Sequence, residues 1–260
     1  MRAVARWEPD QYLKFAGPRL RPALDLLAAV PAMDAARVYD LGCGTGNMAA
    51  HLRSRWPEAA IGGVDSSEEM LAAARAAHPD MDWTQADLAT WAPEAPADLL
   101  YSNAALQWLG DHGALLPRLV RCLAPGGVLA MQMPGNFGSP SHTLIQEVAA
   151  EGSWAGRLAG VGLRDPVASP EAYYGILAPF TRNLDIWETT YLHVLEGADP
   201  VVEWSRGTAL RPVLAALWSE SERAAFLAEY AARIRAAYPP RPDGRTLFPF
   251  RRLFIVAQAA

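Results

Sequence analysis

Short apolar runs alternate with helix-like segments between about Arg37 and Met133 of the chain. The apolar runs have the length and composition of strands, and the segments between them carry apolar residues at helical spacing. This alternation is typical of βαβ units and predicts an α/β fold with a parallel sheet. The predicted strands are Arg37–Leu41, Ala60–Asp65, Met81–Gln85, Asp98–Ser102 and Val128–Met133.

The predicted helices between these strands are Asn47–Arg55, Glu68–Ala77 and Ala114–Cys122. For the second helix, Ser66 and Glu69 form a capping box, because a serine side chain followed three places on by a glutamate satisfies free backbone amides. The Pro125-Gly126-Gly127 sequence predicts a turn before the fifth strand.

The pattern changes after Pro134. A helix is predicted over Ser141–Glu151, a loop over 152–169 and a strand over Leu184–Val194. The segment from 199 to 238 is mostly helical in pattern, and Leu253–Ala257 has the composition of a buried strand that closes the sheet.

Two features support helix in the segment before the last strand. Ser219 and Glu222 form a second capping box, and Phe226, Tyr230 and Ile234 fall on one stripe at four-residue spacing. We therefore expect a helical insertion at about 197–245 that acts as a substrate cap.

The chain has 260 residues, which corresponds to between one and two domains at about 150 residues each. We interpret it as a single domain of three parts. These are an N-terminal helical lid (1–33), a cofactor-binding core (34–135) and a substrate-binding part (136–260).

The formal net charge of −5 argues against nucleic-acid binding, since that affinity comes mainly from Lys and Arg meeting phosphates. Cys43 and Cys122 are too few for a disulfide framework and lack partners at metal-ligand spacing. Apolar runs are far shorter than the roughly 18 residues of a membrane span, and Met1 to Gln11 lacks a signal-peptide pattern. We expect a cytoplasmic protein without a metal, a membrane anchor or an obligate protein partner.

The strongest chemical motif is a strand that runs into three alternate glycines, Gly42, Gly44 and Gly46, and then into a helix. Glycines allow a sharp turn with positive φ, and a helix start offers free N–H groups to a ligand. A dinucleotide-binding loop spaces its glycines as Gly-x-Gly-x-x-Gly. Here Asn47 stands where the third glycine of that pattern falls. Asp40 before the loop would repel a pyrophosphate but attract an ammonium group.

Polar residues follow the next three strands. Asp65 ends the second strand, 21 residues after Gly44, where a carboxylate can accept hydrogen bonds from both hydroxyls of a ribose. Asp87 follows the third strand and can accept a hydrogen bond from an adenine amino group. Asn103 follows the fourth strand, on the edge where a ligand of a parallel sheet lies.

These residues together resemble the class I S-adenosylmethionine-dependent methyltransferases over about residues 34–135. That resemblance implies a Rossmann-like seven-stranded sheet whose last strand is antiparallel. It also implies S-adenosylmethionine as cofactor and S-adenosylhomocysteine as product. The implied cofactor contacts are Asp40 and Gly42 to Gly46 with the methionine part, Asp65 with the ribose, Asp87 and Leu88 with the adenine, and the Asn103 backbone near the sulfonium. Within and beside these stretches, the expected cofactor-binding residues include Gly42, Cys43, Gly44, Gly46, Asn47 and Ser66.

A closer resemblance, to the trans-aconitate 2-methyltransferases, extends over nearly the whole chain. Its matching stretches are Trp7 with Gln11-Tyr12-Leu13-Lys14-Phe15, Ala104-Ala105-Leu106-Gln107-Trp108, Met131-Gln132-Met133-Pro134-Gly135-Asn136, Asp185-Ile186-Trp187-Glu188-Thr189-Thr190-Tyr191, Leu210-Arg211-Pro212 and Phe250-Arg251-Arg252-Leu253-Phe254-Ile255-Val256-Ala257. It departs from the family in the extra start, Met1 to Arg6. The resemblance implies methyl transfer to a carboxylate of a small tricarboxylic acid, which gives a monomethyl ester.

No catalytic base is needed for that reaction, since a carboxylate with a pKa of about 4 is already ionised at neutral pH. The other carboxylates of the substrate must be held, and arginine does this best through its two-pronged geometry. The candidate substrate-binding residues are the cations Arg211, Arg251 and Arg252, the imidazole of His193, and the aromatic side chains of Tyr12, Trp108, Tyr173 and Tyr191.

Three other functions compete with this one. A carboxyl methyltransferase of the malonyl-carrier-protein type shares a motif close to 102–108, but needs a basic docking face that the net charge does not favour. An oxidoreductase is disfavoured by the glycine spacing. A non-catalytic S-adenosylmethionine-binding regulator would carry the same loop, and only turnover separates it from an enzyme.

Overall fold

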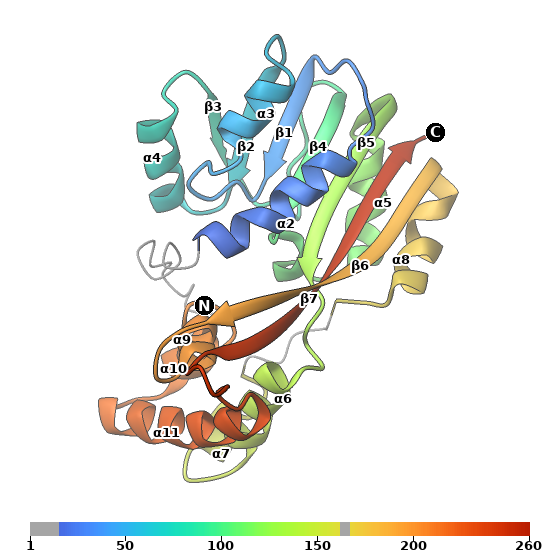
Figure 1. Cartoon of the computed structure of the whole chain (residues 1–260). Helices are drawn as coiled ribbons and strands as arrows, with labels where there is room; N and C mark the ends of the chain where they lie inside the picture. Colours follow the sequence, from blue (N-terminus) through green and yellow to red (C-terminus); the bar gives the residue numbers. More distant parts are fainter. Residues whose placement is uncertain (1–15, 162–166) are drawn as a thin grey trace. The chain divides into compact units, whose positions relative to one another are not determined.

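The protein is described from a computed structural model that covers residues 16–161 and 167–260, with side chains from residue 20 onward. Within the described residues the strands form one seven-stranded sheet in the order β3-β2-β1-β4-β5-β7-β6 (Figure 1). The strands are β1 (Arg37–Leu41), β2 (Ala60–Asp65), β3 (Asp82–Gln85), β4 (Ala97–Asn103), β5 (Leu123–Pro134), β6 (Thr181–Leu195) and β7 (Thr246–Ala259).

Strands β1 to β5 pair in parallel, whereas β7 is antiparallel to β5. The predicted sheet class and the antiparallel last strand are therefore confirmed.

The helices are α2 (Ala16–Ala29), α3 (Ala49–Arg55), α4 (Glu68–Ala77), α5 (His112–Arg121), α6 (Pro140–Ala150), α7 (Ala155–Leu158), α8 (Pro170–Leu177), α9 (Pro200–Arg206), α10 (Arg211–Ala216) and α11 (Glu220–Ala237), with short 3-10 turns at Leu106–Trp108 and Ala178–Phe180.

The described chain forms two compact units. The sheet unit contains Gly17–Pro134, Val167–Thr189 and Arg252–Ala260, and the helical unit contains 135–161 and 190–251. Strands β6 and β7 contribute residues to both. The single-domain interpretation, the lid over 1–33 and the boundary after residue 135 stay predictions.

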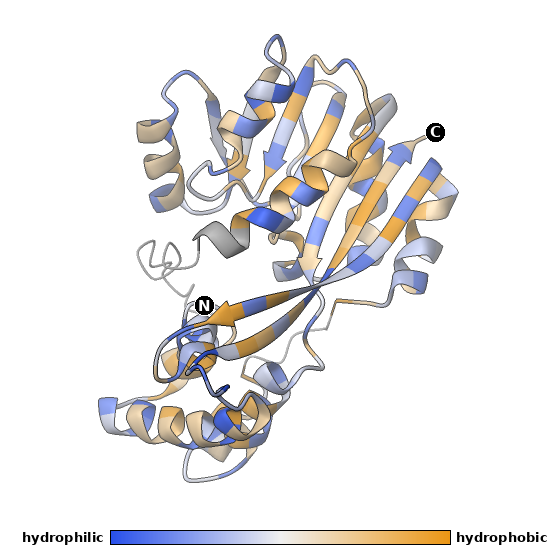
Figure 2. Ribbon diagram, in the orientation of Figure 1, coloured by the Kyte–Doolittle hydropathy of each residue, from blue (hydrophilic) through white to orange (hydrophobic). Residues whose placement is uncertain are grey.

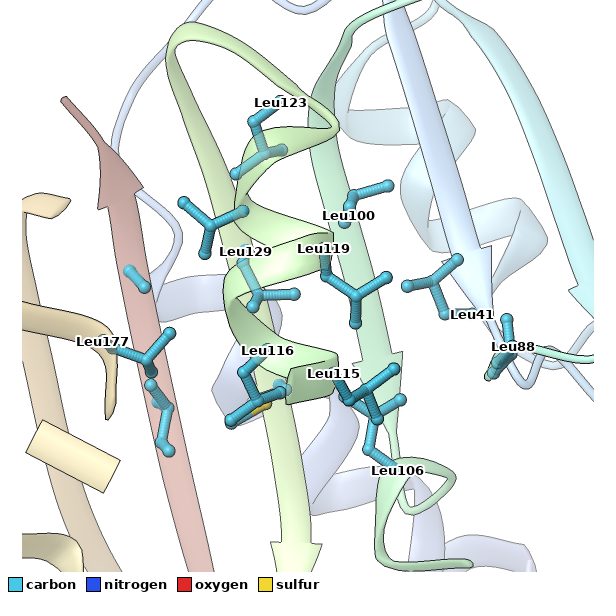
Figure 3. Packing of buried hydrophobic residues seen from close by; sticks show 14 of the residues in the cluster. Leu41, Leu88, Leu100, Leu106, Leu115, Leu116, Leu119, Leu123, Leu129 and Leu177 are labelled. Carbon is cyan, nitrogen blue, oxygen red and sulfur yellow. The ribbon is translucent and has the colours of Figure 1, made fainter. Parts of the chain in front are cut away.

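The core of the sheet unit is rich in leucine. Leucines of α5 pack with leucines of the neighbouring strands, and Leu100, Leu116 and Leu129 are fully buried (Figure 3). Most residues of β4 are buried, as are those of β5 from Gly127 to Met133, and the end of β5 is a nearly continuous apolar run (Figure 2). Each such buried leucine contributes about 1.5–3 kcal/mol to folding.

The helical unit has a separate core. The predicted stripe of Phe226, Tyr230 and Ile234 on α11 is buried there, which confirms that prediction. The Ser219 hydroxyl accepts a hydrogen bond from the Glu222 amide, as the predicted cap requires. No described helix is long and apolar enough to cross a membrane.

The first capping prediction was wrong by one residue. Ser67, not Ser66, is the N-cap of α4, and its hydroxyl accepts a hydrogen bond from the Met70 amide. The Asp65 carboxylate accepts a hydrogen bond from the Ser67 amide. This bond places Ser66 in the turn, so the helix begins at Glu68.

The predicted turn at Pro125-Gly126-Gly127 is instead an irregularity inside β5. Leu123 already pairs with Ala97 of β4, and the register shifts before Leu99. Gly126 takes φ +77°, which is the glycine geometry of a β-bulge. The strand therefore begins five residues earlier than the apolar run predicts.

Two helices lie where none was predicted. Helix α8 begins at Pro170 after Ser169, whose hydroxyl accepts a hydrogen bond from the Ala172 amide. Helix α7 is a single turn inside the segment expected to be a loop. The last strand is also longer than predicted, since β7 begins at Thr246 in the helical unit.

Candidate functional site

The glycine loop between β1 and α3 is held in a geometry that other residues adopt poorly. Gly42 has φ +74°, and a Cβ there would lie 2.2 Å from the Cβ of Ala105. Gly44 has φ +55°, and a Cβ there would meet no atom within 4 Å. The first position therefore needs glycine for close packing, whereas the second exposes backbone to open space beside the loop.

Asp65 at the end of β2 fixes this loop. Its Oδ2 accepts a hydrogen bond of 2.9 Å from the Gly44 amide, and its Oδ1 accepts one of 2.9 Å from the Ser67 amide. A carboxylate has about four acceptor positions, so two of them are left for a ligand. The structure thus brings the first two predicted motifs together at the carboxyl edge of the sheet.

Asp40 on β1 is a buried acid with an exposed fraction of 5%. Burial first, and repulsion from Asp65 second, raise the pKa of Asp40 from 3.8 to about 7. The cost of a buried charge falls when an opposite charge is nearby. A cation bound beside Asp40 would therefore favour its ionised form. Burial likewise raises the pKa of the neighbouring Cys43 thiol above its usual range.

The segments that follow β3 and β4 approach the same loop through Leu88 and Ala105. A Cβ on Gly42 would lie 3.9 Å from Leu88, which itself is buried. Asp87 beside it is exposed and accepts a hydrogen bond from the Ala89 amide. Asn103 ends β4, and the next residue, Ala104, has φ +55°. A non-glycine residue in this conformation is strained, a feature that clusters at functional sites.

Asn47 and Ser66 are exposed at the same end of the sheet unit, Asn47 just before α3 and Ser66 just before α4. Trp108 is also exposed, with 38% of its surface accessible, and follows the fourth strand in a short 3-10 turn.

Tyr173 has the surroundings of a core residue. It is fully buried, and its hydroxyl lies 2.7 Å from Nδ1 of His112 and accepts a hydrogen bond from the Ala168 amide. The Tyr173 hydroxyl is thus hydrogen-bonded within the core of the sheet unit, and its part in substrate binding stays a prediction.

Tyr191 and His193 lie on the part of β6 that belongs to the helical unit. Both are buried, and the His193 ring is 4.6 Å from that of Trp204 and 6.1 Å from that of Phe250. Arg211 is half-buried and is the first residue of α10. Tyr12 lies outside the described residues.

The two adjacent arginines of β7 differ in their surroundings. Arg251 is exposed, and its Nε donates a hydrogen bond of 2.8 Å to the Gly135 carbonyl within the helical unit. Arg252 is buried in the sheet unit, and its Nη1 donates one of 2.9 Å to Oε1 of Gln132. Sequence reasoning missed Gln132, although one polar residue within the apolar run Val128–Met133 is a signal that could have indicated it.

The sheet order, the antiparallel β7 and the glycine loop with an acid at the end of β2 define a class I methyltransferase fold. The YcgJ protein of Bacillus subtilis has a similar structure, with a TM-score of 0.60 and 13% identity over 92% of this chain and 98% of that one. Phosphoethanolamine N-methyltransferase 2 of Haemonchus contortus, solved with S-adenosylhomocysteine, gives a TM-score of 0.58 and 16% identity over 96% of this chain. This chain covers 56% of that enzyme's length.

Sequence comparison is more specific. A family model described as a methyltransferase domain matches residues 38–127. A trans-aconitate 2-methyltransferase of Azoarcus sp. strain BH72 is 57% identical over 96% of this chain and 98% of its own length. One from Methylobacterium nodulans is 53% identical over 98% of this chain and 99% of its own length. The chain belongs to the trans-aconitate 2-methyltransferase family.

Proposed function

We propose that this protein transfers the methyl group of S-adenosylmethionine to a carboxylate of trans-aconitate, which gives a monomethyl ester. The observation that carries the proposal is the 57% identity, over nearly the full length of both chains, to a relative named for this reaction. The substrate is then a small tricarboxylic acid, and no nucleic acid, membrane or obligate protein partner takes part.

The residues of the glycine loop fit the cofactor. The open position beside Gly44 leaves backbone accessible, and Asp65 has acceptor positions for two ribose hydroxyls. Asp40 offers a buried carboxyl whose ionised form an ammonium group stabilises. Bound S-adenosylmethionine supplies a methyl group on a positively charged sulfur. The proposed cofactor contacts are Asp40, Gly42, Cys43, Gly44, Gly46, Asn47, Asp65, Ser66, Asp87, Leu88 and Asn103.

The chain's own task is positioning rather than proton transfer. A carboxylate is already ionised at neutral pH, so it needs no base to become a nucleophile. Holding the oxygen in line with the methyl group and the sulfur, in a site that excludes water, can lower the barrier by about 7–11 kcal/mol. We propose that Arg211, Arg251 and Arg252 bind carboxylates of the acid, each by charge-assisted hydrogen bonds.

A methyl-transfer screen tests the proposed reaction. The protein is incubated with S-adenosylmethionine labelled in its methyl group and with trans-aconitate, cis-aconitate, citrate, isocitrate and malonyl carrier protein in turn. We expect the largest kcat/KM with trans-aconitate. Preference for the carrier protein would favour the alternative carboxyl methyltransferase, and cofactor binding without any turnover would favour a regulator.

Changing Arg211 to Ala is expected to raise the KM for trans-aconitate about tenfold or more, because a charge-assisted hydrogen bond to a carboxylate is lost. The affinity for S-adenosylhomocysteine, measured by calorimetry, is expected to stay at the wild-type value. Arg206→Ala is the matched control, since Arg206 is paired with Glu203 on the exposed face of the preceding helix. If Arg211→Ala weakens both ligands, Arg211 has a structural role instead.

A further inference from the structure

Three polar side chains form a hydrogen-bonded chain across adjacent strands of the sheet unit. The Arg252 guanidinium on β7 donates from Nη1 to Oε1 of Gln132 on β5, at 2.9 Å. Gln132 donates from Nε2 to Oδ1 of Asn103 on β4, at 2.6 Å. Gln132 is fully buried and Arg252 has 4% of its surface exposed. This polar chain therefore links the fourth strand to the last one through the interior of the sheet.

The direction of these hydrogen bonds is set by the charged end. A guanidinium has N–H donors only, so Gln132 must turn its oxygen toward Arg252. The amide N–H groups of Gln132 then face Asn103, which must present its own oxygen. The Nδ2 donor of Asn103 is consequently turned away from Gln132.

The register of the strands places this polar chain beside an aromatic pair. Gln132 pairs with Asn103 on one side and with Phe254 on the other. The Trp187 ring stacks on Phe254 with centroids 4.8 Å apart and an interplanar angle of 10°. Hydrogen bonds that are buried against such apolar groups are stronger than exposed ones. Removing one partner therefore costs more folding free energy than it does at the surface.

We infer that Gln132 is a positioning residue for methyl transfer, which orients the Asn103 amide and the Arg252 guanidinium through one pair of hydrogen bonds. The inference rests on the proposed function, in which Asn103 lies near the cofactor and Arg252 binds a carboxylate of the acid. Gln132 itself contacts neither ligand. Gln132 links Asn103 on the cofactor side to Arg252 on the substrate side. A change at Gln132 therefore alters the binding of both the cofactor and the acid.

The test compares Gln132→Leu with Gln258→Leu. The first change removes both hydrogen bonds of the polar chain. The second removes a hydrogen bond of 3.0 Å between Gln258 and the Gly126 carbonyl, in the same pair of strands. We expect both variants to melt at a lower temperature. Only Gln132→Leu should raise the KM for trans-aconitate about tenfold and weaken S-adenosylhomocysteine binding severalfold, because hydrogen bonds of charged groups are the stronger ones.

A second variant keeps the inference falsifiable if Gln132→Leu does not fold. Gln132→Glu retains an oxygen for Arg252 but loses the donor to Asn103, and its carboxylate competes with the substrate for the guanidinium. We expect the KM for trans-aconitate to rise by more than tenfold over that of the wild type, with S-adenosylhomocysteine affinity weaker than in the wild type.

Equal KM values and equal S-adenosylhomocysteine affinities in the Gln132 variants and in Gln258→Leu would overturn the inference. A wild-type protein that fails to methylate trans-aconitate would overturn the proposed function instead. In that case the S-adenosylhomocysteine affinities still decide the role of Gln132, since they do not depend on the acid.

Discussion

Replacing Asp40 by Asn is expected to raise the melting temperature by several degrees near pH 8 and to leave it almost unchanged near pH 4. The unfolded carboxyl ionises above about pH 4, whereas in the folded protein the pKa is raised from 3.8 to about 7. Between these values the folded state binds more protons than the unfolded state, so stability falls as pH rises. Above about pH 7 the free energy of unfolding has fallen by its full amount, roughly 4 kcal/mol for a pKa raised by about three. Asparagine carries no charge to bury and avoids that loss.

The same substitution is expected to weaken S-adenosylhomocysteine binding about tenfold or more, because the ammonium group of the ligand loses its carboxylate partner. Folding stability and ligand affinity then change in opposite directions. This trade-off is expected where a buried group that destabilises the fold binds a ligand. Thermal melts at the two pH values and calorimetry near pH 8 provide the measurements. An equal change in melting temperature at both pH values would contradict the assignment of the raised pKa to Asp40.

Replacing Asp65 by Ala is expected to weaken S-adenosylhomocysteine binding by about 1.5–3 kcal/mol, since a charged acceptor of the ribose is lost. We expect the loss to lie at the upper end of this range, because the Gly44 and Ser67 amides also lose their acceptor and the glycine loop loses this restraint. Calorimetric titration measures the effect directly.

Asp98→Ala is the matched control for Asp65→Ala. The Asp98 carboxylate also accepts hydrogen bonds from two backbone amides, those of Ala36 and Arg37, at 2.8 Å each. These amides lie at the opposite end of β1 from the glycine loop. We expect Asp98→Ala to lower the melting temperature without changing ligand affinity, and an equal loss of affinity in both variants would refute the ribose assignment.

The parts of the fold that depend on local sequence could be predicted. The strand that contains Asp40, the alternate glycines and the acid at position 65 lie within one βαβ unit, and each carries its own signal in backbone freedom or charge. The stripe of α11 follows in the same way from its four-residue spacing.

Features that depend on contacts between distant residues could not be predicted. The cap of α4 falls on Ser67 because Asp65 captures an amide in the turn, which two adjacent serines do not reveal. The length of β5 depends on pairing with β4 across a bulge. The buried Tyr173 hydroxyl lies 2.7 Å from Nδ1 of His112, which is 61 residues away in the sequence.

The most direct test of the proposed reaction is to follow the methyl group itself. The protein is mixed with trans-aconitate and S-adenosylmethionine that carries carbon-13 in its methyl group, and the products are observed by NMR. The proposed reaction gives a new methyl-ester resonance that grows in step with S-adenosylhomocysteine and disappears on alkaline hydrolysis. S-adenosylhomocysteine formed without that resonance, or no reaction at all, would contradict it.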